Sequence, residues 1–319
     1  MLAKCKDGVR VLNVARGPLV VDADLQAALD SGKVAGAALD VFRSEPVTDH
    51  PLFHYPNVIV TPHLGASTAE ATDRAGYQAA EQVVAALTGG VVTSAVNVPA
   101  VSPEDMEVLG PYLPLCGSLG RIAIALATGA PVHGLRTDVF GRLAERDTRL
   151  LSLEVLRGVL DGHVEEDVNA VNAPAIAEER GLQVTEAKHT VARDFTDFVR
   201  VEVHGADSSI RVGGALFGRR NRPHLIEAWG QRFDVQLESH ITLFRYRDLP
   251  GMLGRVGTVF GEAGVNIVSA AVGRQPDSEP SGDGQLAAMV ITTTTPVPFE
   301  VVDEIVSSEG FVAGQTVAL

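Results

Sequence analysis

Residues that mark secreted, membrane-bound and metal-binding proteins are scarce in this sequence. Cysteine occurs only at Cys5 and Cys116, which excludes a disulfide framework and gives no metal-ligand spacing. No uninterrupted apolar run has the length of a bilayer span, and charged residues occupy the first positions, where a secretory signal would be apolar. We therefore expect a cytoplasmic protein with no membrane segment and no metal site.

The sequence also has fewer basic than acidic residues. The sequence has 26 Lys and Arg against 40 Asp and Glu, a formal net charge of -14 at pH 7. Such a surface repels a phosphodiester backbone, so we expect no nucleic-acid partner. An anionic ligand would need a local basic cluster, and the densest one comprises Arg219, Arg220, Arg222 and His224. A charge run is usually a solvated loop, and an anion-binding site is the alternative interpretation of this cluster.

The 319 residues, 45% of them hydrophobic, suffice for two or three globular domains. Short apolar runs at 9–15, 34–42 and 57–61 alternate with a polar helical stretch at 22–31. Runs of this length around a helix predict parallel strands buried on both faces, which is an α/β architecture. Asp22 is a candidate cap for the start of the helix, and Gly32 is a candidate left-handed residue after its end.

Further along the chain the pattern changes twice. A Ser-Thr-Ala-Glu capping box at 67–70 predicts a helix that runs to Leu87 and ends at Gly89. The Pro-containing segment 97–102 breaks both periodicities, so we expect a linker there and a new domain near residue 100. An α+β pattern follows, with helical stretches at 109–126, 150–160 and 175–180 and alternating strands at 197–204 and 209–212.

Residues 240–319 have the order strand, helix, strand, strand, helix, strand, with a polar hairpin loop at 275–284. This order is that of the ferredoxin-like unit. The glycines between Gly251 and Gly264 could be mistaken for a phosphate-binding loop, but a Gly-x-Gly turn with an acidic residue about 20 positions later is not in register. A turn at Pro250 and Gly251, followed by a helix start with exposed N–H groups, explains them better.

Candidate catalytic residues follow the strand ends of the first part, where open parallel sheets keep ligand-binding groups. Gly17 and Pro18 turn the chain and leave Arg16 as a planar donor for a carboxylate or carbonyl oxygen. If Glu45 folds back onto His63, the carboxylate would orient the imidazole and raise its pKa, making it a general acid near neutral pH. Taken singly, a surface arginine and a partly buried histidine are the commoner interpretations.

Three sequence segments that contain these residues occur together, and this joint occurrence favours a catalytic role over the structural interpretations. They are Asn-Val-Ala-Arg-Gly-Pro at 13–18, Asp-Val-Phe-Arg-Ser-Glu-Pro at 40–46 and Thr-Pro-His-Leu-Gly-Ala-Ser-Thr at 61–68. In this order they resemble the D-isomer-specific 2-hydroxyacid dehydrogenase family. The resemblance implies hydride transfer between C2 of a hydroxy acid and NAD.

The same resemblance assigns a role to each matching residue. Arg16 would bind the substrate carboxylate and carbonyl, and Glu45 and His63 would form a proton-transferring dyad. Asp40 would contact the nicotinamide carboxamide. The same cofactor cleft would be lined by Ala15 and Gly65.

The rest of the chain narrows the choice within the family. The segment 171–181 resembles the intervening domain of long-form phosphoglycerate dehydrogenases, and 246–267 resembles an ACT domain, the amino-acid-sensing module. The resemblance implies an L-serine effector held between two ACT domains, and therefore a homo-oligomer. The matching effector residues are Tyr246, Asp248, Gly251, Leu253 and Asn266.

The resemblance divides the chain into four parts. They are the C-terminal part of a Rossmann-like NAD-binding domain (1–66), a returning helix and linker of the catalytic domain (67–99), the intervening domain (100–238) and the ACT domain (239–319). The family's Gly-x-Gly-x-x-Gly loop, which holds the cofactor pyrophosphate, is not in the sequence, and residues 1–8 match a helix end in mid-domain. We therefore expect the 319-residue chain to have no dehydrogenase activity by itself.

The implied activity is NAD-dependent oxidation of 3-phospho-D-glycerate to 3-phosphohydroxypyruvate in L-serine biosynthesis, with feedback by serine. Two alternatives stay open. One is a serine-binding regulatory module without catalysis. The other is a different D-2-hydroxyacid dehydrogenase, which the tail disfavours.

Overall fold

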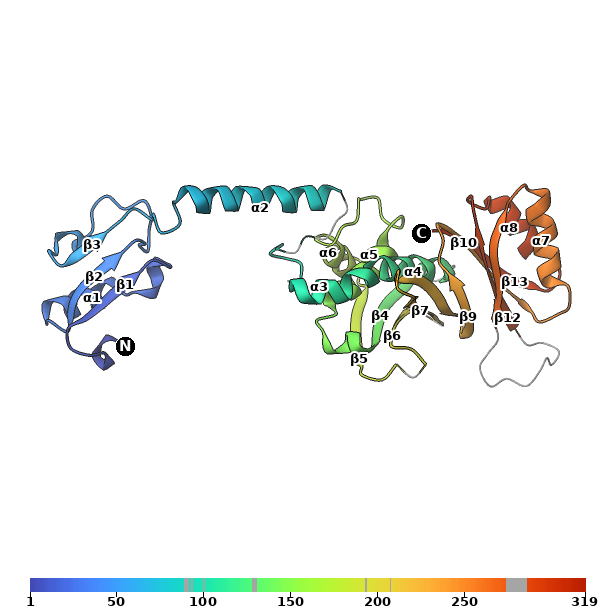
Figure 1. Ribbon diagram of the computed structural model, residues 1–319, viewed down its shortest axis with the longest axis horizontal. Coiled ribbons are helices and arrows are strands. Elements are labelled where there is room, and N and C mark those ends of the chain that lie inside the picture. The colour runs from blue at the N-terminus through green and yellow to red at the C-terminus, as the bar shows by residue number, and fades with distance from the viewer. Residues whose placement is uncertain are drawn as a thin grey trace. The chain divides into compact units, whose positions relative to one another are not determined.

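The computed structural model describes residues 1–319 except 89–91, 93, 100, 128–130, 193, 207 and 274–285. The chain divides into two compact units, Met1–Val91 and Val92–Leu319 (Figure 1). The hairpin loop expected at 275–284 and the helix end expected at Gly89 lie outside the described residues.

The described strands of the first unit form a parallel sheet in the order β1-β2-β3, as the alternating runs predict. The strands are β1 (Val9–Asn13), β2 (Val34–Leu39) and β3 (Val58–Val60), with α1 (Asp22–Asp30) and the 3-10 turns Leu2–Lys4, Gly17–Leu19 and Pro51–His54 between them. Leu25, Leu29 and Leu39 form its core. The prediction that the strands are buried on both faces is wrong for the outer strands β1 and β3, because Leu12 is 72% exposed and Ile59 is 69% exposed.

The helix ends of this unit differ slightly from prediction. Asp22 is the first residue of α1 and not its cap; Val21 holds that position, and the Asp22 carboxylate lies at the positive end of the helix dipole. Gly32 has φ +73°, so its left-handed conformation is confirmed. The long helix α2 (Ala69–Leu87) is capped by Thr68, one residue later than predicted, and has no buried residue in its described length.

The first part of the second unit is the predicted α+β segment. Its described strands form one sheet in the order β5-β4-β6-β7-β8-β9, with β4 parallel to β5 and the other pairs antiparallel. The strands are β4 (Val132–Gly141), β5 (Gln183–His189), β6 (Asp197–Gly205), β7 (Ser209–Phe217), β8 (Arg222–Ala228) and β9 (Gln231–Gln236). The helices are α3 (Pro103–Leu109), α4 (Leu113–Leu126), α5 (Arg149–Leu160) and α6 (Ala173–Glu179), with 3-10 turns at Gly110–Tyr112 and Arg142–Glu145.

Glycines let α4 and α5 cross closely over this sheet. A Cβ on Gly120 would lie 2.3 Å from the carbonyl oxygen of Val155, and one on Gly158 would lie 2.2 Å from that of Gly117. The helical segment Pro103–Leu126 has a membrane span's length and mean hydropathy, contrary to our expectation from the sequence, but half of its most apolar 18-residue stretch is buried. Its side chains fill the core of this unit, which explains its composition.

The end of the chain has the predicted ferredoxin-like order. Its elements are β10 (His240–Arg247), α7 (Met252–Glu262), β11 (Ile267–Gly273), β12 (Leu286–Thr293), α8 (Phe299–Val306) and β13 (Phe311–Ala318), and the sheet order is β11-β12-β10-β13. The helices α7 and α8 cover one face of this sheet (Figure 1). Phe244 and Met289 belong to the core on that side. The other face places Leu243 and Val290 in the core of the preceding α+β segment.

Candidate active site

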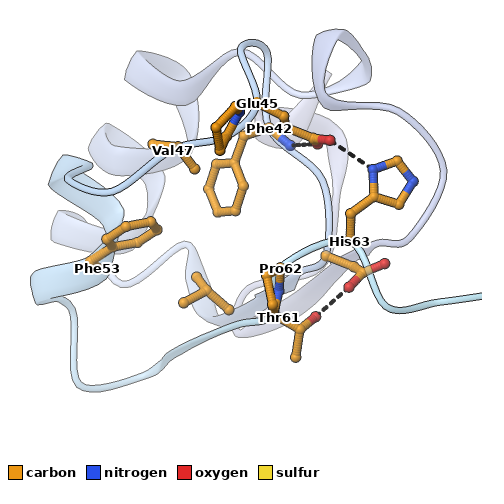
Figure 2. A pocket seen from close by; sticks show the side chains of 10 residues that line it. Phe42, Glu45, Val47, Phe53, Thr61, Pro62 and His63 are labelled. Atoms are coloured by element: carbon orange, nitrogen blue, oxygen red, sulfur yellow. Dashed lines mark hydrogen bonds and ion pairs between the residues drawn. The ribbon is translucent and has the colours of Figure 1, made fainter. Parts of the chain in front are cut away.

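Glu45 and His63 lie together at the carboxyl edge of the parallel sheet. The Nδ1 atom of His63 is 2.7 Å from Oε2 of Glu45, and the Phe42 N–H donates to the other carboxylate oxygen at 2.8 Å. The hydrogen bond to His63, followed by that from Phe42, lowers the pKa of the Glu45 carboxyl. Glu45 is therefore ionised near neutral pH and fixes the imidazole, whose other nitrogen points away from the carboxylate (Figure 2).

Asp40 holds the loop that carries His63. Its carboxylate accepts hydrogen bonds from the Thr61 hydroxyl and from the N–H groups of Leu64 and Gly65, at 2.7 and 2.8 Å to the two amides. Its carbonyl accepts from the His63 N–H at 2.9 Å. These bonds offset the cost of the left-handed backbone of His63, which has φ +57°. The Thr61 bond contributes most to lowering the pKa of Asp40.

The Arg16 loop is fixed by a neighbouring side chain, Asn13. The Asn13 amide donates to the carbonyl of Arg16 at 2.9 Å and accepts from the Ala15 N–H at 3.2 Å. The Asn13 carbonyl in turn accepts from the Asp40 N–H at 2.9 Å, which ties this loop to the one that carries His63. The Arg16 guanidinium is exposed and donates to the carbonyl of Ala15 at 2.6 Å.

Two glycines allow the loops to meet. A Cβ on Gly17 would lie 2.0 Å from the carbonyl carbon of Phe42, so no larger residue fits between these segments. A Cβ on Gly65 would lie 3.0 Å from a carboxylate oxygen of Asp40 and 3.8 Å from the side chain of Val14. Ala15, Asp40 and Gly65 thus belong to one contiguous region, beside Arg16.

A cavity of about 560 Å³ opens next to the dyad (Figure 2). Asp40, Glu45, Thr61 and His63 line it, whereas Arg16 is not among its lining residues. Its apolar wall, which our sequence analysis did not identify, is formed by Phe42, Pro46, Val47, Phe53, Val60 and Pro62. The Phe42 and Phe53 rings meet edge to face at 5.5 Å, and the short 3-10 turn around Phe53 gave no catalytic signal in the sequence.

The proposed effector residues lie at opposite ends of the ferredoxin-like sheet. Asp248 and Gly251 lie between β10 and α7, where Gly251 (φ +88°) is the N-cap and Leu253 is in the first turn. Asn266 immediately precedes β11, whose first residue pairs with Thr293. Thr293 also pairs with His240, the first residue of β10, so Asn266 lies at the end of the sheet where β10 begins. One chain therefore does not bring Asn266 to Asp248. The Tyr246 side chain is 2% exposed and packs against Phe311.

Arg219 and Arg220 of the basic cluster lie on the turn between β7 and β8, whereas Arg222 and His224 belong to β8 itself. Arg222 donates to Gln236 at 3.0 Å, and the Nδ1 atom of His224 is 2.7 Å from Asp234. Arg219 and Arg220 are exposed. This placement suits a solvated turn and an anion site equally well.

Three family models match successive parts of the chain. Residues 1–65 match the D-isomer specific 2-hydroxyacid dehydrogenase NAD binding domain, 108–228 the D-3-phosphoglycerate dehydrogenase intervening domain, and 240–310 the ACT domain. A solved structure of the D-isomer specific 2-hydroxyacid dehydrogenase from Xanthobacter autotrophicus, in complex with NADPH and MES, is 43% identical. The match covers 28% of this chain and 37% of that one, with a TM-score of 0.26.

Curated relatives cover more of the chain. The D-3-phosphoglycerate dehydrogenase of Mycobacterium tuberculosis is 43% identical over 84% of this chain and 51% of its own length. Those of Mycobacterium leprae and Archaeoglobus fulgidus are 40% and 34% identical over 96% and 99% of this chain, and 57% and 59% of their own lengths. This chain thus spans a little over half the length of these relatives, and it belongs to the D-3-phosphoglycerate dehydrogenase family of D-isomer specific 2-hydroxyacid dehydrogenases.

Proposed function

We propose that the chain is the part of an NAD-dependent phosphoglycerate dehydrogenase that supplies its proton-transfer dyad, its substrate arginine and its regulatory tail. The reaction is oxidation of 3-phospho-D-glycerate to 3-phosphohydroxypyruvate, a step toward L-serine. The observation that carries the proposal is the 2.7 Å contact between His63 and Glu45 beside a cavity. The names of the relatives support the choice of substrate.

The chemistry follows from these side chains. The substrate's C2 hydroxyl would lie at the free nitrogen of His63, which takes the hydroxyl proton while the C2–H bond gives up its hydride and the ketone forms. Glu45 stabilises the resulting imidazolium without taking the proton itself. Arg16 would turn from the carbonyl of Ala15 to the substrate carboxylate, which a planar guanidinium binds through two parallel hydrogen bonds.

NAD, when bound, supplies the hydride acceptor. The residues near the dyad fit its nicotinamide end, because a carboxylate offers about four acceptor positions and the loop donors use three of those on Asp40. One position is left for a carboxamide N–H. The missing side chain of Gly65 lets its backbone approach the Asp40 carboxylate, to which its N–H donates.

The regulatory proposal is that L-serine binds between the ACT parts of two copies. The opposite placement of Asp248 and Asn266 supports it, because a twofold pairing brings opposite ends of two sheets together. Exposed N–H groups at the start of α7 would hold the serine carboxylate. We also propose a cytoplasmic homo-oligomer whose cluster of Arg219, Arg220, Arg222 and His224 binds an anionic effector.

Two measurements test this function. A full-length protein that carries the Gly-rich loop ahead of this segment should form NADH from 3-phospho-D-glycerate and not from D-lactate. The polypeptide of residues 1–319 should bind L-serine in calorimetry without forming NADH. Absence of NADH formation in the full-length protein, with serine binding retained, would leave the regulatory module as the function.

A further inference from the structure

A second cavity lies in the α+β segment, on the sheet face away from α4 and α5. Its volume is about 310 Å³, near the lower bound for pockets that hold small molecules. Strand alternation explains the placement, because Val199 and Val201 point into the helix-covered core while Phe198 and Arg200 point to the other face. Phe140 and Phe195 complete the aromatic wall.

An arginine in the lining of this cavity lies over two aromatic rings. The guanidinium carbon of Arg200 is 5.2 Å from the ring centre of Phe140 and 5.6 Å from that of Phe198. Its Nε and Nη2 atoms both donate to one oxygen of Glu227, Oε2, at 3.1 and 3.0 Å. The Glu227 side chain is 13% exposed, so this pair lies in a partly desolvated site where charge-assisted bonds are strong.

This pairing does not use Nη1 of Arg200 or Oε1 of Glu227. Among the residues that the structure describes, Nη1 of Arg200 and Oε1 of Glu227 have no protein partner. At the mouth, Arg232 and Asp194 form a looser pair, 3.2 Å apart with both side chains more than half exposed. The described lining therefore carries two ion pairs: the less exposed pair of Arg200 and Glu227, and the more exposed pair of Arg232 and Asp194.

We propose that this cavity binds an α-amino acid with an apolar side chain. The carboxylate would accept from Nη1 of Arg200, and the ammonium would donate to Oε1 of Glu227. The apolar side chain would lie against Phe140 and Phe195. A zwitterion matches such a lining, whereas a phosphate ester would meet the carboxylates of Glu227 and Asp194. The site is separate from the dyad and from the residues proposed to hold serine, and it does not rest on the proposed function.

The test is calorimetry on the 319-residue chain with L-phenylalanine, phenylpyruvate and inorganic phosphate as probes. We expect L-phenylalanine to bind and phenylpyruvate, which lacks the ammonium group, to bind at least about tenfold more weakly. Phosphate should not compete. No binding of L-phenylalanine, or displacement of it by phosphate, overturns the proposal.

Variants locate the binding. Glu227→Gln and Arg200→Gln should each weaken L-phenylalanine by about tenfold or more, because each removes one charged partner. Arg211→Gln is the matched control, since Arg211 forms a 3.5 Å pair with Glu202 on the same sheet outside the cavity, and it should leave the affinity unchanged. If Arg200→Gln unfolds, Arg200→Lys keeps the charge and should still lose affinity through its lost planar donors. Equal binding by wild type and Glu227→Gln contradicts the assignment.

Discussion

The dyad region and the ACT part differ in how they bring polar groups together. In the first unit, Asn13 and Asp40 fix the loops of Arg16 and His63 through hydrogen bonds within one chain. In the ACT part, Asp248 and Asn266 lie at opposite ends of a single sheet. The first site is therefore preorganised by its own strands, whereas we propose that the second is completed by another copy.

The largest effect should come from the preorganised site. In a full-length protein, His63→Ala should lower kcat by about two to four orders of magnitude, because the hydroxyl proton loses its acceptor. NADH affinity should change little. Steady-state kinetics and NADH titration measure the two quantities.

A matched control for this variant is His54→Ala. His54 is 77% exposed and 3.7 Å from Asp49, outside the residues that line the cavity. Its kcat should equal that of the wild type. If His63→Ala also keeps the wild-type kcat, His63 has no part in proton transfer.

Arg16→Lys should have the next largest effect. An ammonium cannot form the two parallel hydrogen bonds of a guanidinium, so the substrate KM should rise by about 10- to 100-fold with a smaller change in kcat. Arg10→Lys on β1 serves as the control, since Arg10 is exposed and belongs to none of the three motif segments. An unchanged KM would show that Arg16 does not hold the substrate.

The split effector site predicts complementation between variants. Asp248→Ala and Asn266→Ala should each lose L-serine affinity by about tenfold or more, because each removes a polar partner of the ligand. Mixed and allowed to exchange subunits, the two variants should regain one of the two sites in each mixed dimer. Calorimetry of the mixture measures the recovered sites, and Asp303→Asn, exposed on α8, is the control. No recovery on mixing would contradict a site shared between copies.

The sequence predicts these two regions unequally. The resemblance of three ordered segments to a known family selected Arg16, Glu45 and His63, and their positions after parallel strands predicted that they lie at one edge of the sheet. The anchoring role of Asn13 and the apolar wall around Phe53 were not predictable, because they depend on which loop lies against which after folding. The separation of Asp248 from Asn266 follows from the predicted strand-helix-strand order, because β10 and β11 are parallel and the end of one therefore lies at the opposite edge from the start of the other.

The smallest effect concerns how Asp40 holds the His63 loop. The pKa of Asp40 is lowered from 3.8, chiefly by the Thr61 hydroxyl and then by the Leu64 N–H. Its hydrogen bonds therefore stabilise the folded loop at pH values above the pKa of the unfolded chain. This stabilisation is lost as the pH falls through the lower pKa of the folded state. Hydrogen exchange should therefore show the Leu64 and Gly65 amides losing protection at acid pH before the rest of the unit unfolds.

The Ala37 amide is the internal control. It donates to the Asn57 carbonyl at 3.0 Å, an acceptor that does not titrate, and it should stay protected over the same pH range. In Asp40→Asn, protection of Leu64 and Gly65 should be lower than in the wild type at pH values where Asp40 is ionised, and it should not change with the ionisation of this side chain. Parallel loss of protection at Ala37 and Gly65 would mean that the whole unit opens, and not that Asp40 releases the loop.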